Sequence, residues 1–250
     1  MKHDRINVME QYIQQHQSLT NEELCERFHI SVQTLRRDID ILVQRGNVGK
    51  VYGGVVWENH EIKSSVEDSQ TRNTSNTSAK EKIGKMAARE VNDGEVIFID
   101  SGTTAYHMVK HLVTKNNITI ITHSIDVVNQ VQGYNQLRLI VLGGQYNNST
   151  NSIFVDTSEV SYKVDKAFIA TVGVDTKGCS NTNLPEGKIK KYMLEEANKA
   201  YLLADSSKFK VNAFNRFASL ESFDVIVCNQ KCPEWLEDIC HQYGITYIHQ

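Results

Sequence analysis

Hydroxyl, amide and guanidinium side chains gather in one short stretch of the chain, residues 31–46. Its first half carries Ser31, Gln33, Thr34, Arg36 and Arg37. Such groups can hydrogen-bond base edges in a DNA major groove and the phosphates beside them. This chemistry needs the side chains on one exposed face near a helix N-terminus, where the helix dipole favours phosphate. The stretch is therefore a candidate for reading DNA.

The same stretch has the pattern of one helix with both ends marked. Ser31 is a good N-cap, and Gly46 is placed to end the helix in the left-handed conformation. Apolar residues recur at helical spacing and predict one buried stripe, formed by Val32, Leu35, Ile39 and Leu42. The opposite, exposed face would carry Gln33, Arg37, Asp40 and Gln44, with Thr34 and Arg36 on its flanks.

The flanking residues predict the elements that would hold this helix in place. Thr20 and Glu23 form a capping box for a short preceding helix, and residues 29–30 leave room only for a tight turn. An earlier helix over residues 4–16 would close a three-helix core with Ile6, Met9, Tyr12 and Ile13. After residue 46, β-forming residues split by glycines suit a small wing hairpin over residues 48–56. Together these are the parts of a winged helix-turn-helix.

The motifs resemble those of a known family. Ser-x-x-Thr-Leu-Arg-Arg-Asp at residues 31–38, followed by Val-Tyr-Gly-Gly at residues 51–54, resembles the DNA-binding domain of DeoR-type transcriptional regulators. The resemblance implies binding to double-stranded operator DNA. The predicted contacts are Ser31, Gln33, Thr34, Arg36, Arg37, Lys50 and Tyr52. The alternative is a helical module that only pairs subunits, which the arginine pair and the two-glycine wing make less attractive.

The charge of this region argues for more than one DNA-binding unit. Residues 1–57 hold seven Lys and Arg against seven Asp and Glu, so the strongly basic footprint of many DNA-binding domains is missing. Residues 31–57 hold four basic against two acidic side chains, which places the positive charge on the docking elements. We therefore expect a homo-oligomer, a dimer or a tetramer, to gather enough phosphate contacts.

The length and composition of the chain indicate its division into domains and its class of protein. The 250 residues suffice for a small module, residues 1–57, a polar linker, residues 58–79, and one larger domain, residues 80–250. There is no apolar run of about 20 residues and no signal peptide, so the prediction is a cytoplasmic protein without a membrane partner. The five cysteines are an odd number without a paired Cys-x-x-Cys spacing, which favours free thiols over a zinc site. No metal or cofactor is expected.

The larger domain alternates between helix and strand patterns. Buried strands are predicted at residues 95–100, 118–122, 137–142, 166–172, 200–204, 224–228 and 245–248. Helices are predicted at residues 80–91, 103–113, 184–198 and 233–243. Apolar strands that alternate with helices indicate a Rossmann-like α/β fold, with a mainly parallel sheet covered on both faces.

Four strand ends carry small, hydroxylic or charged residues. They are residues 100–104 (Asp-Ser-Gly-Thr-Thr), 122–124 (Thr-His-Ser), 143–144 (Gly-Gly) and 205–208 (Asp-Ser-Ser-Lys). Ligands of such folds bind beyond the carboxyl ends of the strands, and hydroxyls with first-turn N–H groups suit an anion such as phosphate. The alternative is that these residues are only N-caps and turns.

The resemblance extends across this domain. DeoR-type regulators carry a C-terminal sensor similar to ribose-5-phosphate isomerase, which implies a phosphorylated sugar as effector. The resemblance implies that Asp-x-Gly-Thr-Thr lines the phosphate site and that Glu186 and Asp205 bond sugar hydroxyls. It also implies that Lys190 and Lys208 either supply positive charge to the phosphate or hold the acidic residues in place. The predicted effector-binding residues are Asp100, Gly102, Thr103, Thr104, Thr122, His123, Ser124, Gly143, Gly144, Glu186, Lys190, Asp205 and Lys208. His123, Gly187 and the run Ser-Asn-Thr-Asn at residues 180–183 depart from the family pattern, which leaves the identity of the ligand open.

These patterns favour a regulator, most simply a repressor of a carbohydrate-catabolism operon. A sugar-phosphate isomerase or deaminase with an attached helix-turn-helix is the alternative, with Asp100, Glu186 and Asp205 as conceivable acids and bases. No recognisable acid–base pair stands in the sequence, and we assign no catalytic residue. His107 and His111 could share a metal, but a solvated helix face is the simpler interpretation.

Overall fold

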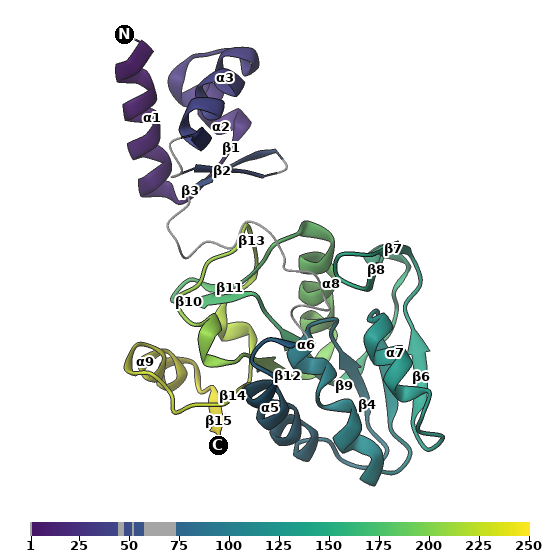
Figure 1. Ribbon diagram of the computed structural model, residues 1–250. Helices are drawn as coiled ribbons and strands as arrows, with labels where there is room; N and C mark the ends of the chain where they lie inside the picture. The colour runs from purple at the N-terminus through teal and green to yellow at the C-terminus, as the bar shows by residue number, and fades with distance from the viewer. Residues whose placement is uncertain (1, 45–47, 52, 58–73) are drawn as a thin grey trace. The chain divides into compact units, whose positions relative to one another are not determined.

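The computed structural model describes residues 2–44, 48–51, 53–57 and 74–250 (Figure 1). They fall into two compact units, one built mainly on residues 1–65 and the other mainly on residues 66–250. Each unit has its own hydrophobic core. Within these described ranges, no helix is long and apolar enough to cross a membrane.

In its described residues, the N-terminal unit packs three helices beside a small antiparallel sheet. The helices are α1 (Lys2–His16), α2 (Asn21–Phe28) and α3 (Val32–Gln44). The strands are β1 (Ser18–Thr20), β2 (Val48–Val51) and β3 (Gly54–Trp57), in the order β1-β3-β2. The helices and the β2–β3 hairpin confirm the winged helix-turn-helix. Strand β1 was not predicted, because three residues are too few to show an alternating pattern.

Local hydrogen bonds set the turn between α2 and α3. Thr20 Oγ1 accepts from the Glu23 N–H at 3.1 Å, and the Glu23 carboxylate accepts from the Thr20 N–H at 2.7 Å, which confirms the capping box. His29 ends α2 in the left-handed conformation, with φ of 51°. Ser31 Oγ then accepts from the Thr34 N–H at 3.3 Å at the start of α3. Gly46, the expected end of this helix, lies outside the described residues.

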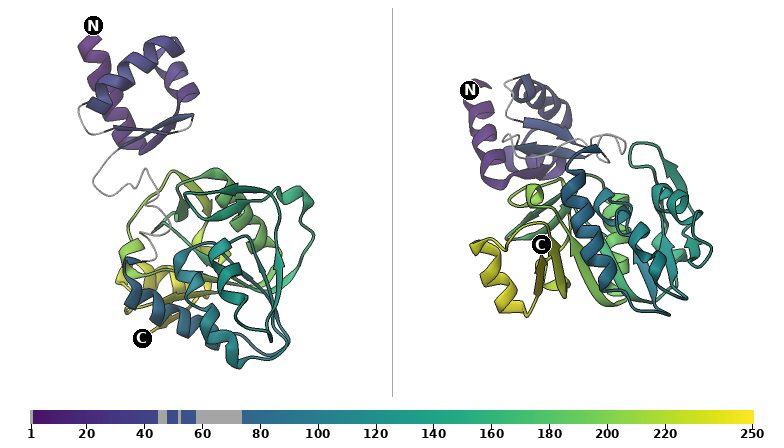
Figure 2. Two further views of the ribbon diagram at one scale, coloured as in Figure 1. Left: turned by 45° about the vertical axis from the view of Figure 1, so that its right-hand side comes forward. Right: turned by 60° about the horizontal axis from the view of Figure 1, so that its bottom comes forward.

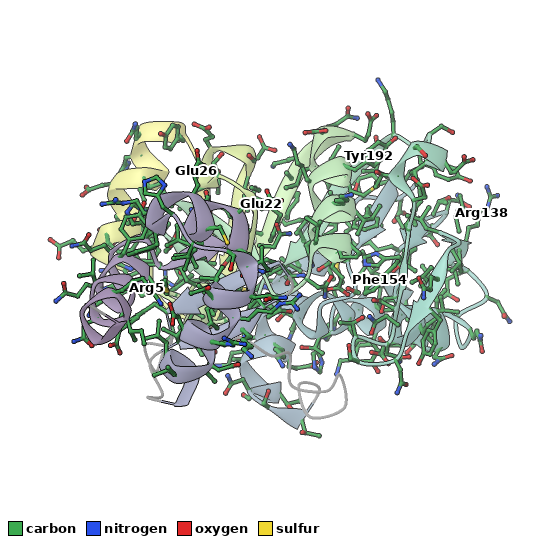
Figure 3. All side chains as sticks on the ribbon, turned by 90° about the horizontal axis from the view of Figure 1, so that it is seen from above. Arg5, Glu22, Glu26, Arg138, Phe154 and Tyr192 are labelled. Atoms are coloured by element: carbon green, nitrogen blue, oxygen red, sulfur yellow. The ribbon has the colours of Figure 1, made fainter. Side chains whose placement is uncertain are left out.

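The buried face of α3 differs from the predicted stripe at two positions. Leu35, Ile39 and Leu42 are buried as predicted, but Val32 is 50% exposed. Val32 lies in the first turn of the helix, beyond the edge of the core. Asp38 is buried instead, because Arg5 on α1 reaches it with Nε at 2.9 Å and Nη2 at 2.7 Å from Oδ2 (Arg5 is labelled in Figure 3). An ion pair therefore joins α1 to α3 within the core.

The C-terminal unit, mainly residues 66–250 and named the sensor unit after its expected role, is organised by a seven-stranded parallel sheet, which confirms the predicted fold class. Its order is β15-β14-β12-β9-β4-β5-β6. In chain order the strands are β4 (Val96–Ile99), β5 (Thr119–Thr122), β6 (Arg138–Val141), β9 (Val164–Ala170), β12 (Ala197–Leu203), β14 (Val225–Cys228) and β15 (Thr246–His249). Each adjacent pair runs parallel.

Helices cover both faces of this sheet, as the views in Figures 1 and 2 show. The α-helices are α5 (Thr77–Arg89), α6 (Thr103–Tyr106), α7 (Ile125–Val131), α8 (Leu184–Glu195) and α9 (Glu234–Tyr243). Four 3₁₀ turns add η1 (Val109–Thr114), η2 (Thr157–Glu159), η3 (Ser206–Lys208) and η4 (Leu220–Ser222). Side chains of a strand alternate between the two cores. Ile97 and Ile99 pack with α5 and η1, whereas Phe98 packs with α8.

The helix predicted over residues 103–113 is broken into α6 and η1. Gly84 of α5 lies so close to this break that a Cβ atom at Gly84 would be 2.5 Å from the His107 carbonyl carbon. The solvated-face interpretation of the two histidines is therefore wrong for His107, which is buried. His107 Nδ1 and His111 Nε2 lie 3.2 and 3.0 Å from the two carboxylate oxygens of Glu81 on α5.

Two small antiparallel sheets were not predicted. One is the hairpin of β7 (Gln145–Asn147) and β8 (Ser152–Phe154). The other joins β10 (Gly173–Asp175), β11 (Gly178–Asn181) and β13 (Asn215–Ala218). These strands have three or four residues and many polar ones, so no apolar alternation marks them. Helix α5 also begins three residues earlier than the expected Lys80.

Candidate DNA-binding face and effector site

The predicted DNA-contacting side chains of α3 lie on its exposed surface. Gln33, Arg36 and Arg37 are exposed, and Thr34 is half-buried. Gln33 and Arg37 are one helical turn apart, so they share a face. Ser31 and Thr34 bond each other through their hydroxyls at 3.1 Å, which orders the start of the helix.

The wing contributes one described residue to this face. Lys50 Nζ of β2 bonds the Asp40 carboxylate of α3, and both side chains are more than half exposed. Part of the Lys50 charge is thus compensated by Asp40, which lies on the predicted reading face. Tyr52, the remaining predicted contact, lies outside the described residues.

The sensor unit brings four predicted residues from three elements into one buried cluster. Asp100 follows β4, His123 follows β5, and Glu186 and Lys190 lie one turn apart on α8. Lys190 Nζ bonds Asp100 Oδ2 and donates to the Ala170 carbonyl at 3.0 Å. Asp100 Oδ2 also accepts from the backbone N–H groups of Gly102 and Ala170. The Lys190–Asp100 pair is almost fully removed from solvent.

Glu186 accepts hydrogen bonds from three neutral donors. Its Oε1 accepts from Ser101 Oγ at 3.0 Å and from Ser152 Oγ at 2.8 Å, and its Oε2 accepts from Asn181 Nδ2 at 3.1 Å. Burial acts to raise the pKa of Glu186, but Lys190, His123 and these hydrogen bonds outweigh it and hold the pKa below its ordinary value. A carboxylate that accepts from hydroxyls and amides could also accept from the hydroxyls of a ligand.

The three donors to Glu186 were not among the predicted site residues. Ser101 stands within the quoted Asp-x-Gly-Thr-Thr motif, at its unspecified position. Asn181 belongs to β11 and Ser152 to β8, two strands that had no recognisable pattern. Ser101 and Asn181 stand in segments that correspond to family motifs, and only Ser152 had no signal in the sequence.

His123 is fully buried, and both of its ring nitrogens are without a hydrogen-bond partner among the described residues. The ring stacks on Phe98, and Nε2 lies 3.9 Å from Asp100 Oδ1. Burial lowers the pKa of His123 below its ordinary value despite the nearby carboxylates. A neutral imidazole offers one donor and one acceptor, so His123 could bond a ligand hydroxyl in either sense.

The Ser-Gly-Thr-Thr loop combines a close packing contact with unused hydroxyls. A Cβ atom at Gly102 would be 2.2 Å from Ala170 Cβ, so only glycine fits there. Thr103 and Thr104 are buried in the first turn of α6, and within the described chain their hydroxyls make no hydrogen bond. These hydroxyls and the adjacent backbone are available to an anion.

Thr122 and Ser124, by contrast, have hydroxyls used by the fold. Thr122 Oγ1 donates to the Ile99 carbonyl at 2.7 Å and accepts from the Ser124 N–H at 3.1 Å. Ser124 Oγ caps α7 by accepting from the Val127 N–H at 3.3 Å. The N-cap interpretation therefore describes these two residues well, whatever else they contact.

Gly143 and Gly144 lead into the β7–β8 hairpin and are exposed. The hairpin is held against the end of β5, because the Ile153 N–H donates to the His123 carbonyl at 2.8 Å and the Ile125 N–H donates to the Asn151 carbonyl at 3.0 Å. Through Ser152 it reaches Glu186. Phe154, labelled in Figure 3, closes the hairpin opposite Gly144.

Replacing Gly144 with alanine is expected to displace this hairpin and destabilise the sensor unit by about 1–2 kcal/mol. Gly144 has φ of 151°, and a Cβ atom would lie 2.1 Å from the Phe154 carbonyl oxygen. Urea unfolding measures the loss. The matched control is Gly143→Ala, because a Cβ atom at Gly143 meets nothing within 4 Å. Equal losses in the two variants would contradict the assignment.

Asp205 and Lys208 lie at the end of β12, at a second position along the same sheet edge. Asp205 Oδ1 caps η3 by accepting from the Ser207 N–H at 3.1 Å, and it lies 3.5 Å from Asn76 Nδ2. Asp205 Oδ2 is buried without a hydrogen-bond partner in the described chain. Lys208, in the last turn of η3, is half-buried. No hydrogen bond joins Asp205 to the Asp100 and Glu186 carboxylates among the described residues.

The thiols and histidines do not form a metal centre in the part of the chain that the structure describes. No group of three or more His, Cys, Asp or Glu side chains is placed to hold an ion there. The five cysteines are free. Burial, with the neighbouring Cys240, raises the pKa of the Cys232 thiol to about 12.

Comparison with known proteins gives the class. The chain matches the DeoR-like helix-turn-helix domain over residues 5–61 and the DeoR C-terminal sensor domain over residues 75–230. It is 36% identical to the HTH-type transcriptional regulator IolR of Bacillus subtilis, over 98% of this chain and 99% of that protein. It is 25% identical to the glycerol-3-phosphate regulon repressor of Escherichia coli, over 92% of this chain and 91% of that protein. A solved ribose 5-phosphate isomerase A from Methanocaldococcus jannaschii is 24% identical over 54% of this chain and 55% of that one, with a TM-score of 0.41.

A helix-turn-helix unit joined to a parallel α/β sensor defines a two-domain transcriptional regulator. The chain belongs to the DeoR family of such regulators. It is a DNA-binding regulator and not the isomerase or deaminase that the sequence left as an alternative, because relatives that match along nearly its whole length are named transcriptional regulators.

Proposed function

We propose that this regulator represses a carbohydrate-catabolism operon and is controlled by a phosphorylated sugar bound at the Asp100–Glu186 cluster. The observation that carries the proposal is the set of unused polar groups at this cluster. Both ring nitrogens of His123 and Asp100 Oδ1 are buried without hydrogen-bond partners among the described residues. The hydroxyls of Thr103 and Thr104 lie in the adjacent first turn of α6 and make no hydrogen bond within the described chain. A buried polar group without a partner costs about 1–3 kcal/mol, which a bound ligand would recover.

The two ends of the proposed ligand would meet different chemistry. Glu186 and Asp100 are carboxylates, which suit hydroxyl groups and repel an anion. The Thr103 and Thr104 hydroxyls and the adjacent backbone suit phosphate. The name of one relative agrees with this chemistry, since it is the glycerol-3-phosphate regulon repressor of Escherichia coli.

Regulation would work by linkage between the two sites. The effector binds the DNA-competent and DNA-free arrangements with different affinity, and so it shifts the balance between them. A homo-oligomer, dimer or tetramer, would place two reading helices on two half-sites. This also meets the need for phosphate contacts that a DNA-binding unit with balanced charge cannot supply alone.

The test is binding of the purified protein to its own upstream DNA at physiological salt, with a panel of sugar phosphates and the matching free sugars. We expect one phosphate to change the affinity of a specific complex while its free sugar does not. DNA binding that is indifferent to every phosphate would overturn the effector proposal and leave the DNA-binding assignment standing.

Arg37→Ala is expected to weaken specific DNA binding about 10- to 100-fold, the effect of one lost base or phosphate contact. Arg37 is exposed on α3, one turn from Gln33. Fluorescence anisotropy with a labelled duplex gives the affinity. Arg138→Ala, an exposed arginine on β6 of the sensor unit, is the matched control and should bind DNA normally. Unchanged binding in Arg37→Ala would show that α3 presents a different face.

A further inference from the structure

We propose that the groove between α5 and η1 is a second anion site, distinct from the effector cluster, that binds an oligophosphate. The groove has a volume of about 470 Å³. It is lined by Lys85, Ala88, Arg89, Lys110, His111, Val113, Thr114 and Lys115. Five of these eight side chains are basic or imidazole groups, and none is acidic. The whole chain has a net charge of −3, so this cluster of basic side chains creates a local positive field on an otherwise slightly acidic protein.

Glu81 fixes one end of the groove by pairing with Lys110 and His111, and the Asp93 carboxylate lies near Lys115 at the other end. Glu81 bonds Lys110 at 2.6 Å and His111 at 3.0 Å, so it ties α5 to η1. Lys85 and Arg89 follow Glu81 on the same face of α5, at successive turns. Neither Lys85 nor Arg89 has an ion-pair partner in the described parts of the chain. Their charges are therefore available to a ligand.

The spacing of the charges selects the ligand class. Lys85 and Arg89 are four residues apart, about 6 Å along the helix axis. Lys110 and Lys115 lie on the opposite wall. A single phosphate cannot contact all of these cations, whereas a chain of two or three phosphates can lie between the two rows. Ala88 and Val113 supply an apolar surface beside them, which could hold a nucleoside.

The groove and the effector cluster lie at opposite edges of the sheet. The end of α5 precedes β4, and the end of η1 precedes β5, so the groove is at the amino ends of these strands. Asp100 and His123 follow the carboxyl ends of the same two strands. An anion bound in the groove would thus contact none of the effector residues.

The test is calorimetric titration of the full-length protein with tripolyphosphate, ATP and inorganic phosphate at equal ionic strength. We expect one tripolyphosphate per chain, bound at least tenfold more tightly than phosphate. Lys85→Gln/Arg89→Gln should weaken it at least tenfold. The control Lys163→Gln/Lys177→Gln removes two exposed lysines elsewhere and should bind within about twofold of the wild type. Fold-changes of this size are expected when charge-assisted hydrogen bonds between the protein and a phosphate are lost.

Other results of these titrations would identify the bound ligand or overturn the proposal. Tighter binding of ATP than of tripolyphosphate would identify a nucleotide, and equal binding would identify the phosphate chain as the recognised part. Equal weakening in the control variant would overturn the proposal, because binding would then reflect net charge. Loss of binding in Thr103→Val/Thr104→Val, with the groove variant unaffected, would also overturn it and place the anion at the effector cluster. A change in self-association without anion binding would assign the groove to subunit contact instead.

A separate observation, the exposure of Val32, carries a second inference. We propose that Val32 contacts a thymine methyl group in the operator. This inference rests on the proposed DNA-reading face of α3. Val32 is 50% exposed in the first turn of α3, directly beside Gln33 and one turn from Arg36. In the major groove the C5-methyl of thymine is the apolar feature that distinguishes it. An apolar side chain among hydrogen-bonding ones therefore gains most by facing a thymine.

The test uses a duplex selected from a random pool by the full-length protein, with each thymine replaced in turn by uracil, which lacks only the methyl group. We expect one replacement to weaken wild-type binding about three- to tenfold, as burial of one or two methyl groups predicts, and to have no effect on Val32→Ala. Val43→Ala, an exposed valine near the other end of α3, should bind normally. If Arg37→Ala weakens binding but no thymine replacement affects the wild type and spares Val32→Ala, the inference about Val32 is wrong and the reading face of α3 still stands. If Arg37→Ala has no effect, the reading face itself fails.

Discussion

Lys190→Met is expected to lower the unfolding free energy of the sensor unit by about 3–5 kcal/mol, the cost of leaving a buried charge without its partner. Asp100 is fully buried, and Lys190 is its only cationic partner at hydrogen-bond distance among the described residues. Lys190 also bonds the Ala170 carbonyl at 3.0 Å. Methionine fills a similar volume, so most of the loss reports the stranded carboxylate and not a cavity.

The chain provides a reporter and a matched control for this measurement. Trp57 lies in the core of the N-terminal unit and Trp235 in the sensor unit, so a Trp57→Phe background lets fluorescence follow sensor unfolding alone. Lys191 pairs with Glu195 at 4.0 Å, with both side chains about two-thirds exposed. Lys191→Met should change stability by less than about 0.5 kcal/mol. Lys190→Met combined with Asp100→Asn should recover part of the loss, and no recovery would contradict this account of Asp100.

The sequence was enough to predict elements with strong local periodicity. The helices of the N-terminal unit, the wing and the parallel sheet all follow from apolar spacing and end signals. The capping box of Thr20 and Glu23 has the predicted geometry. At the sensor cluster, the Asp-x-Gly-Thr-Thr motif identified Asp100, and the resemblance to the family identified Glu186 and Lys190. The structure places these three residues together.

Contacts between distant, weakly patterned segments could not be predicted. Ser152 reaches Glu186 from a hairpin whose short polar strands have no apolar alternation. The helical period also assigns a face to each residue of α3 without showing where the core ends. Val32 was therefore expected to be buried, whereas Asp38 is buried only because Arg5 of α1 pairs with it. Both differences have the same origin: burial depends on which neighbour covers a face.

That pairing leads to a prediction for the DNA-binding unit. Arg5→Met is expected to lower the unfolding free energy of this unit by about 2–3 kcal/mol, less than full burial would give, because the Arg5 side chain is 29% exposed. Asp38 would be left in the core without its cationic partner, and its Oδ1 is already without a hydrogen-bond partner in the described chain. Fluorescence of Trp57 in a Trp235→Phe background follows the unfolding.

The same helix supplies the control for this prediction, because α3 carries two acidic residues with basic partners. Asp38 pairs with Arg5 inside the core, whereas Asp40 pairs with Lys50 where both side chains are more than half exposed. Lys50→Met should leave stability within about 0.5 kcal/mol of the wild type. Equal losses in Arg5→Met and Lys50→Met would show that burial does not distinguish the two pairs. The expected result is a large loss of stability in Arg5→Met alone. Arg5→Met should then also lose DNA binding at temperatures where Arg37→Ala is still folded. This result would distinguish Arg5, which holds α3 in place, from Arg37, which is proposed to read DNA.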